Sequence, residues 1–586
     1  MFEKEFITHK IVLFVALIFI LCFSYHKYLS EKNGISSQEG AIYAISNTSE
    51  SLADSPYNSS KYNTELLQKD IINQPFFISL PSIFTYVNEI AKQPENNSIL
   101  LTSSDYNNKT WIERSYYTNL LSVEKDHRFQ YDRVQENCIL CQRAPLYYYL
   151  LHTVSSIFGS FHLYRLGFSI NVLFLFFTAF CMLTMGKKYF HSSYAGLAAA
   201  LMYALSLGCV SSMVCATPYI MVSFFLVLTM RIHLSILRKN TTPMYLYEAI
   251  ALVNIIGNLT DYSYILFSTL LCLCFVIALV LLRRPKEILC YVTFQLASVL
   301  VTVLIYPAAI LHVCTIAIHV FHQFRFHFQR EEFYQNCITN LNVISSQLFM
   351  HTAILLFFVL LLLLVFAIFL KRGSFFSHLS HFFERMSTGD MADLLIPATA
   401  LLYFFGITCF NLNDNYFILT TLLPFLALVV SYVTYRLCNA AIHSEFNSGI
   451  LGIAVTCALC FITITTSTPK YLYADAIDKT SFAASHSKEY CIFLSSDTLK
   501  ASDHILELEK YNHSLVLSRN RIKSLKKDTA FLSQDSVLVY LSTDDYLHSV
   551  IDKIAKFGKF EIVQQLTDYT DEYSNHVYIY QLRRKV

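Results

Sequence analysis

The chain is poor in charge. Of its 586 residues only 15% are Asp, Glu, Lys or Arg, whereas 54% are hydrophobic. A water-soluble protein of this length needs far more polar surface. The formal net charge is only +2, and no Lys/Arg-rich patch occurs. The low charge excludes an ordinary soluble domain, the net charge says nothing about nucleic acid, and no basic patch suggests such a partner.

Other absences narrow the chemistry. Cys138 and Cys141 form a Cys-x-x-Cys motif in a polar region, but no second ligand pair with suitable spacing follows. We therefore expect a local disulfide or two free thiols there, and no structural metal site. The C-terminal region has no glycine-rich phosphate loop after a strand, so we assign it no nucleotide.

What is present is a series of apolar runs of about 20 residues, the length that crosses a hydrocarbon core of about 30 Å. No small-residue cleavage site follows the first run, so we interpret it as a retained helix. The sequence predicts a polytopic α-helical membrane protein with about eleven transmembrane helices. The predicted spans are 11–29, 163–185, 194–212, 216–235, 245–258, 262–282, 289–312, 346–370, 391–410, 416–435 and 449–467.

The distribution of Lys and Arg predicts the orientation. Every second connection between the spans is basic, and the short alternate connections near 213–215, 259–261 and 411–415 contain no Lys or Arg. The positive-inside rule then predicts a cytoplasmic N-terminus in a multi-pass plasma membrane protein, which we expect to be bacterial.

This topology divides the chain into four parts. Residues 1–29 form the first transmembrane helix, and 30–162 form a large extracytoplasmic loop that ends in an interfacial helix. Residues 163–467 form the multi-helix transmembrane domain, and 468–586 form a soluble extracytoplasmic domain. In that last part we predict strands at 489–496, 535–543 and 576–582 and helices at 501–511 and 544–557. The alternation is typical of a compact α/β module.

One motif resembles a known family. "APLYYYLLHTVSSIFG" (144–159) precedes "YRLGFSINVLFLFF" (164–177). This resembles the Pro-Leu-Tyr-Tyr segment of GT-C fold membrane glycosyltransferases, the family of protein O-mannosyltransferases and aminoarabinose transferases. "NLTDYSYILF" (258–267) and "NDNYFILTTLLPFLAL" (413–428) are similar to other family segments. The resemblance covers roughly residues 10–465.

The resemblance implies a GT-C-like fold and a glycosyltransferase activity. The donor would be a polyprenyl-phosphate-linked sugar at the outer face of the bilayer. The acceptor would be an envelope glycan, a lipid or a protein. Two alternatives stay open. The first is a catalytically inactive scaffold in envelope glycan assembly. The second is a transporter or flippase of lipid-linked sugars, although we find no repeat between the two halves of the chain.

The chemistry points to candidate residues. Transfer from a polyprenyl phosphate needs a carboxylate to take the proton of the acceptor, and cations or a divalent metal to hold the phosphate. The family's acidic pair corresponds to Gln38-Glu39, which makes Glu39 the predicted catalytic base. Arg143 and Arg165 are the predicted phosphate-binding residues, since Arg binds phosphate oxygens in bidentate fashion and is costly to place in lipid.

Six further residues are candidates for the site: Asp132, Glu136, Tyr147, Tyr148, Asp261 and Arg325. Several of them also have an ordinary structural explanation. Asp132 and Glu136 are four residues apart and suit a solvated helix face. The consecutive tyrosines spread around a helix and suit a membrane interface. Arg165 can also reach the interface from a helix end.

Overall fold

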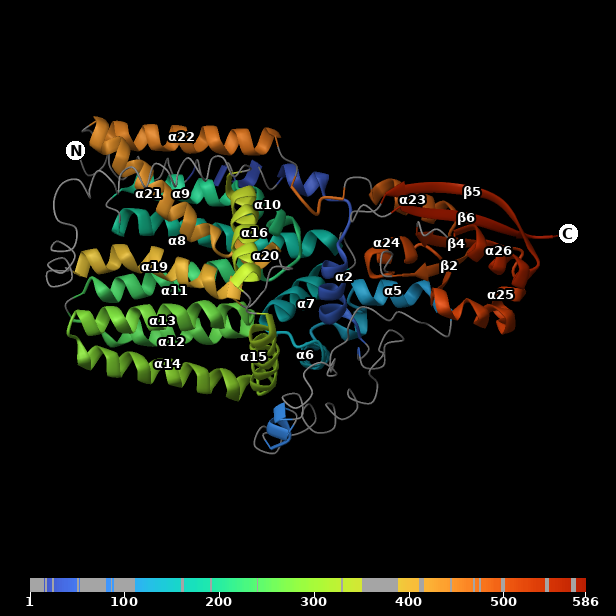
Figure 1. The fold of residues 1–586 in the computed structure, drawn as a ribbon, viewed down its shortest axis with the longest axis horizontal. Helices are drawn as coiled ribbons and strands as arrows, with labels where there is room; N and C mark the ends of the chain where they lie inside the picture. The colour runs from blue at the N-terminus through green and yellow to red at the C-terminus, as the bar shows by residue number, and fades with distance from the viewer. Residues whose placement is uncertain are drawn as a thin grey trace.

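The structure is a computed structural model of the whole chain. It describes residues 26–49, 111–159, 163–189, 192–239, 241–327, 330–349, 388–409, 416–442, 445–466, 469–473, 476–496, 501–542, 547–570 and 576–585, together with scattered positions in 15–23, residue 52 and parts of 81–88. A bundle of long helices fills one end of the molecule, and a β-sheet with short helices fills the other (Figure 1).

The bundle contains helices that can cross a membrane. Among the described residues, five spans are long and apolar enough, and four of them fall close to predicted spans, Pro285–Ile305 being the exception. They comprise α8 (Leu163–Tyr189), α11 (Tyr219–Leu237), α13 (Ser263–Leu281), α14 (Pro285–Ile305) and the pair α20 (Tyr416–Thr420) and α21 (Leu423–Ile442). A bent pair, α9 (Ser193–Ala204) and α10 (Leu207–Val214), adds a sixth if the two helices form one span.

Other apolar helices complete the described bundle. They are α12 (Met244–Thr260), α19 (Thr388–Cys409) and α22 (Glu445–Thr466). Most of the predicted span 11–29 and nearly all of 346–370 lie outside the described residues. The count of eleven therefore stays a prediction.

One predicted span is wrong in its bounds. The run 289–312 is not a single helix, because α14 ends at Ile305 and α15 (Ala308–His327) begins after Pro307. Pro307 has no N–H and forces the residue before it out of the helical conformation, which breaks the helix. Helices α15 and α16 (Arg330–Phe349) then run across the direction of the bundle (Figure 1).

The same break corrects the prediction for Arg325. The sequence places Arg325 in a loop after the seventh span, whereas the backbone at this position belongs to helix α15. Its side chain lies outside the described residues. The described residues of the segment that contains it, 322–327 and 330–336, are helical.

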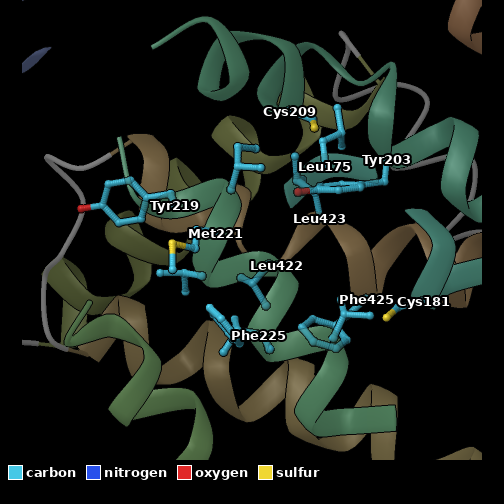
Figure 2. Packing of buried hydrophobic residues seen from close by; sticks show 14 of the residues in the cluster. Leu175, Cys181, Tyr203, Cys209, Tyr219, Met221, Phe225, Leu422, Leu423 and Phe425 are labelled. Atoms are coloured by element: carbon cyan, nitrogen blue, oxygen red, sulfur yellow. The ribbon is translucent and has the colours of Figure 1, made fainter. Parts of the chain in front are cut away.

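The bundle core is aliphatic and aromatic. Figure 2 shows side chains from α8, α9, α10, α11 and the α20–α21 segment packing together, among them Phe225 and Phe425. Helices α8 and α9 approach most closely at two glycines. A Cβ atom on Gly186 would lie 2.2 Å from the Cα of Gly196, so neither position tolerates a side chain. Close helix contact through small residues is typical of membrane bundles.

A buried hydrogen-bond network joins four bundle helices. The amide Nδ2 of Asn254 on α12 donates to Oε1 of Gln295 on α14 at 2.6 Å. The hydroxyl of Tyr264 on α13 donates to Oδ1 of Asn254 at 2.6 Å, and lies 2.6 Å from Oγ1 of Thr229 on α11. Asn254 is therefore the central member of the network.

The other end of the molecule is a six-stranded mixed sheet. The strand order is β1-β3-β2-β4-β6-β5, with β2 parallel to both β3 and β4. The strands are β1 (Ile112–Glu113), β2 (Tyr490–Ser495), β3 (His513–Ser518), β4 (Ser536–Ser542), β5 (Phe560–Thr570) and β6 (His576–Arg584). The predicted strands 489–496, 535–543 and 576–582 correspond to β2, β4 and β6, while β3 and β5 were not predicted.

The first loop contributes to this sheet. Strand β1 pairs antiparallel with β3, and helix α5 (Arg114–Leu121) follows it. The indole N–H of Trp111 donates to the carboxylate of Asp528 at 3.1 Å, and the hydroxyls of Tyr117 and Ser514 lie 2.8 Å apart. The loop and the C-terminal region therefore share one folded unit, although more than 350 residues separate them in the sequence.

The network at Asn254 gives a first prediction. Replacing Asn254 with Leu removes the hydrogen bonds that Gln295 and Tyr264 make to its amide, and leaves the Tyr264 hydroxyl with Thr229 alone. We expect a loss of roughly 1–2 kcal/mol in stability, measured by thermal unfolding in detergent. Thr293→Val is the matched control, because the Thr293 hydroxyl donates only to a carbonyl of its own helix, at an exposed position. Equal stability of the two variants would contradict the network's role.

Candidate active site

The candidate site begins at helix α2 (Ser37–Asn47), the first described helix of the large loop. Ser36 caps the helix: its hydroxyl accepts from the backbone N–H of Glu39 at 3.1 Å. The carboxylate of Glu39 in turn accepts from the backbone N–H of Ser36 at 3.0 Å. This reciprocal pair is a capping box. It fixes the direction in which the Glu39 side chain leaves the helix.

Glu39 forms a buried ion pair with Lys32. The ammonium of Lys32 lies 2.8 Å from Oε2 and 3.0 Å from Oε1 of Glu39, and both side chains are 0% exposed. Oε1 also accepts from the backbone N–H of Ala216 at 2.9 Å. Burial of two charges is costly unless the geometry is good and further hydrogen bonds satisfy them. Here the extra donors come from both α2 and the bundle.

A distant segment completes the coordination of Lys32. Its ammonium also donates to the carbonyl of Tyr471 at 2.9 Å and lies 5.2 Å from the ring centre of Tyr473. Both tyrosines have positive φ angles, 69° and 54°. Bulky residues rarely adopt this conformation, and such strain persists only where the surroundings enforce it. The segment between the bundle and the C-terminal sheet is thereby held against Lys32.

Asn171 in helix α8 shapes the bundle side of the site. Its amide Nδ2 donates to the carbonyls of Ser212, Met213 and Cys215, the last at 2.7 Å. These contacts hold the turn between α10 and α11, whose Ala216 N–H meets Glu39. A polar amide inside an apolar span is expensive unless it is satisfied in this way.

The tyrosines of helix α7 (Leu146–Phe158) face two different groups. Tyr147 is fully buried, and its hydroxyl donates to Oδ1 of Asn171 at 3.4 Å. Tyr148 is also buried, and it lies next to Arg143 and within electrostatic reach of Asp261. Burial raises the pKa of both phenols, so both stay protonated and can donate hydrogen bonds. Helix α7 thus stands between Glu39 and Arg143.

Arg143 lies in the turn between helix α6 (Tyr131–Leu140) and helix α7. Its backbone is fixed: the N–H donates to the carbonyl of Cys138 at 2.8 Å, and its carbonyl accepts from the hydroxyl of Tyr306 at 3.1 Å. Its side chain is exposed and forms no ion pair with any described residue. Tyr148, Tyr219 and Asp261 lie within electrostatic reach of its guanidinium.

Asp261 lies at the C-terminal end of helix α12. Its Oδ1 accepts from the backbone N–H of Ser263 at 2.9 Å and from the hydroxyl of Ser263 at 2.6 Å. The side chain is half-buried, and no bond to Oδ2 occurs among the described residues. Arg143, Tyr148 and Asp261 therefore form a second polar group beside the Glu39 group.

The remaining predicted residues differ in their exposure and in their partners. Asp132 is exposed in the first turn of α6, as a solvated face predicts. Glu136 is buried and pairs with Arg133 at 2.6 Å, so the predicted solvated face is wrong for this residue. Arg165 is half-buried at the head of the α8 span.

The Cys-x-x-Cys motif has two free thiols in this structure. Burial raises the pKa of the Cys141 thiol to about 12, and the pKa of Cys138 is also raised. Within the part of the chain that the structure describes, no three His, Cys, Asp or Glu side chains come together as a metal site requires.

Sequence reasoning missed several members of the site. Lys32 and Asn171 were not predicted, nor was the contact with Tyr471. The sequence did contain a signal for Lys32. Ser36-Ser37-Gln38-Glu39 is a capping-box pattern, which predicts that a helix begins here and that the Glu39 side chain lies close to Lys32. No local pattern could have revealed Tyr471, which is 439 residues away from Lys32 along the chain.

The architecture is similar to the GT-C fold. A solved structure with this fold is ArnT from Cupriavidus metallidurans, an aminoarabinose transferase. In the apo state it gives a TM-score of 0.50 at 10% identity, over 98% of this chain and 98% of that chain. The structure of ArnT bound to undecaprenyl phosphate gives 0.44, with the same identity and coverage. The predicted resemblance is confirmed for the fold. No protein-family model and no curated protein matches the sequence.

The buried ion pair gives a second prediction. Lys32→Met leaves the Glu39 carboxylate buried without a counter-ion, and we expect a loss of roughly 3–5 kcal/mol in stability. The double variant Lys32→Met/Glu39→Met removes both charges and should recover most of that loss. Thermal unfolding of the three proteins in detergent measures the difference. A double variant no more stable than Lys32→Met would contradict the pairing.

Proposed function

We propose that the protein is an integral membrane glycosyltransferase. It moves a sugar from a polyprenyl-phosphate carrier to a cell-envelope acceptor at the outer face of the membrane. Support comes from the GT-C fold and from the two polar groups that flank helix α7. The predicted orientation, with the C-terminal sheet outside, puts these groups at the extracytoplasmic end of the bundle.

The observation that carries the proposal is the setting of Arg143. The exposed residue Arg143, with no ion pair among the described residues, lies beside the protonated phenol of Tyr148. A guanidinium binds two phosphate oxygens at once, and a neutral phenol can donate to a third. Arg143 and Tyr148 would hold the donor phosphate, with Arg165 as the further predicted cation.

The reaction needs one bond exchange. An acceptor oxygen attacks the anomeric carbon of the sugar, and the bond from that carbon to the phosphate oxygen breaks. The electron pair leaves with the polyprenyl phosphate, whose growing negative charge Arg143 stabilises. The proton of the acceptor goes to a carboxylate.

Two carboxylates are suited to take this proton. Glu39 is the base that the family resemblance predicts, but Lys32, Ser36 and Ala216 occupy both of its oxygens in this conformation. It would act as a base once one of these donors moves away. The charge of Asp261 acts on Arg143 more strongly than that of Glu39. One oxygen of Asp261 has no bond to a described residue. We propose Glu39 as the base and name Asp261 as its competitor.

The test is release of polyprenyl phosphate from a panel of polyprenyl-phosphate sugars by purified protein in lipid nanodiscs. We expect the wild type to release the lipid. Arg143→Gln should lower the rate of release by about 100-fold, because removal of one hydrogen-bond donor to the charge of the transition state typically costs this much. Asp132→Asn is the matched control, because Asp132 is an exposed carboxylate of the same loop. It should leave the rate unchanged.

The carboxylate variants assign the base. Glu39→Gln and Lys32→Met both break the buried pair, so loss of release in Glu39→Gln but not in Lys32→Met supports Glu39. Loss in Asp261→Asn alone transfers the role to Asp261. Lipid binding without release by the wild type would favour an inactive scaffold, and movement of the intact donor across the bilayer would favour a flippase.

A further inference from the structure

We propose that the end of the bundle opposite Glu39 binds the phosphate headgroup of an anionic diacyl phospholipid. The site lies between helices α8, α11 and α12, where Lys188, Arg231 and Lys239 come together. It is distinct from the donor site, because α8 and α11 run the length of the bundle between them (Figure 1).

Three connections of the bundle meet at this end. The guanidinium of Arg238 donates to the carbonyls of Lys188 and Tyr189, each at 2.7 Å. The guanidinium of Arg284 donates to the carbonyl of Lys239 at 2.8 Å. The turns after α8, α11 and α13 are therefore tied together, and their basic side chains are gathered in one place.

Arg231 is the unusual member. It lies six residues before the end of the α11 span, which places it within the depth of the membrane. Its guanidinium donates to the sulfur of Cys181 at 4.0 Å, a weak acceptor. No described carboxylate pairs with it, although charged residues within spans normally pair with one another or line a site.

Lys188 and Lys239 add two further cations. The ammonium of Lys188 donates to the hydroxyl of Ser235 at 3.1 Å, and that of Lys239 donates to the hydroxyl of Tyr245 at 3.0 Å. Lys188 lies within electrostatic reach of Arg231 and Lys239, so the like charges repel. Within the described part of the chain, neither lysine has a carboxylate in an ion pair.

Charge complementarity identifies the missing partner as an anion. The nearby acid Glu287 is already engaged by Arg284 at 3.6 Å and by the hydroxyl of Thr242 at 2.9 Å. Arg231 lies within the apolar span, where acyl chains surround the bundle, and this favours the phosphate of a lipid headgroup over a free anion. Met244 and Tyr245 are exposed at the start of α12, where acyl chains and an interfacial aromatic would meet.

The test is lipid retention in native mass spectrometry of the full-length protein. The probes are phosphatidylglycerol and, as the uncharged-headgroup comparison, phosphatidylcholine. We expect Arg231→Gln to weaken phosphatidylglycerol binding about fivefold and Lys188→Gln/Lys239→Gln roughly 30-fold, since each basic residue near anionic lipid contributes a factor of about five. Phosphatidylcholine binding should not change.

The control is Arg283→Gln/Lys286→Gln, which removes two exposed charges from the same end of the bundle. It should leave retention within twofold of the wild type. Equal weakening by the control and by Lys188→Gln/Lys239→Gln would overturn the site in favour of a general charge effect. Displacement of the lipid by excess inorganic phosphate would also overturn it, because a free anion would then be the ligand.

Discussion

The buried ion pair between Lys32 and Glu39 is the constraint on which the candidate site depends. Two opposite charges with no solvent contact are stable only while every donor and acceptor around them is in place. Those groups come from the start of α2, from the turn before α11 and from the segment at Tyr471. The pair therefore ties the large loop, the membrane bundle and the approach to the C-terminal sheet together at a single point.

Helix α7 separates two polar groups, one around Glu39 and one around Arg143. Successive residues on a helix are about 100° apart, so Tyr147 faces the Glu39 side while Tyr148 faces Arg143. A carboxylate and a guanidinium are thereby kept apart by a layer of neutral phenols. Glu39 is left to pair with Lys32, and Arg143 has Asp261 as the carboxylate within its electrostatic reach.

The sequence was informative where local physics decides the outcome. The apolar runs predict the spans α8, α11 and α13, and the Pro-Leu-Tyr-Tyr motif predicts helix α7 and the GT-C fold. It was misleading where a single residue interrupts a pattern, as Pro307 does within 289–312. The sequence did not predict contacts between distant segments, such as that of Lys32 with Tyr471 and the pairing of β1 with β3. These contacts depend on tertiary packing, which no local periodicity encodes.

The most direct measurement is a cryo-EM structure of the protein in nanodiscs with a bound polyprenyl phosphate. We expect the phosphate within hydrogen-bond distance of the Arg143 guanidinium and the Tyr148 hydroxyl, on the side of helix α7 away from Lys32. A phosphate bound elsewhere on the bundle, with Arg143 facing only solvent, would contradict a sugar-transfer centre at this place.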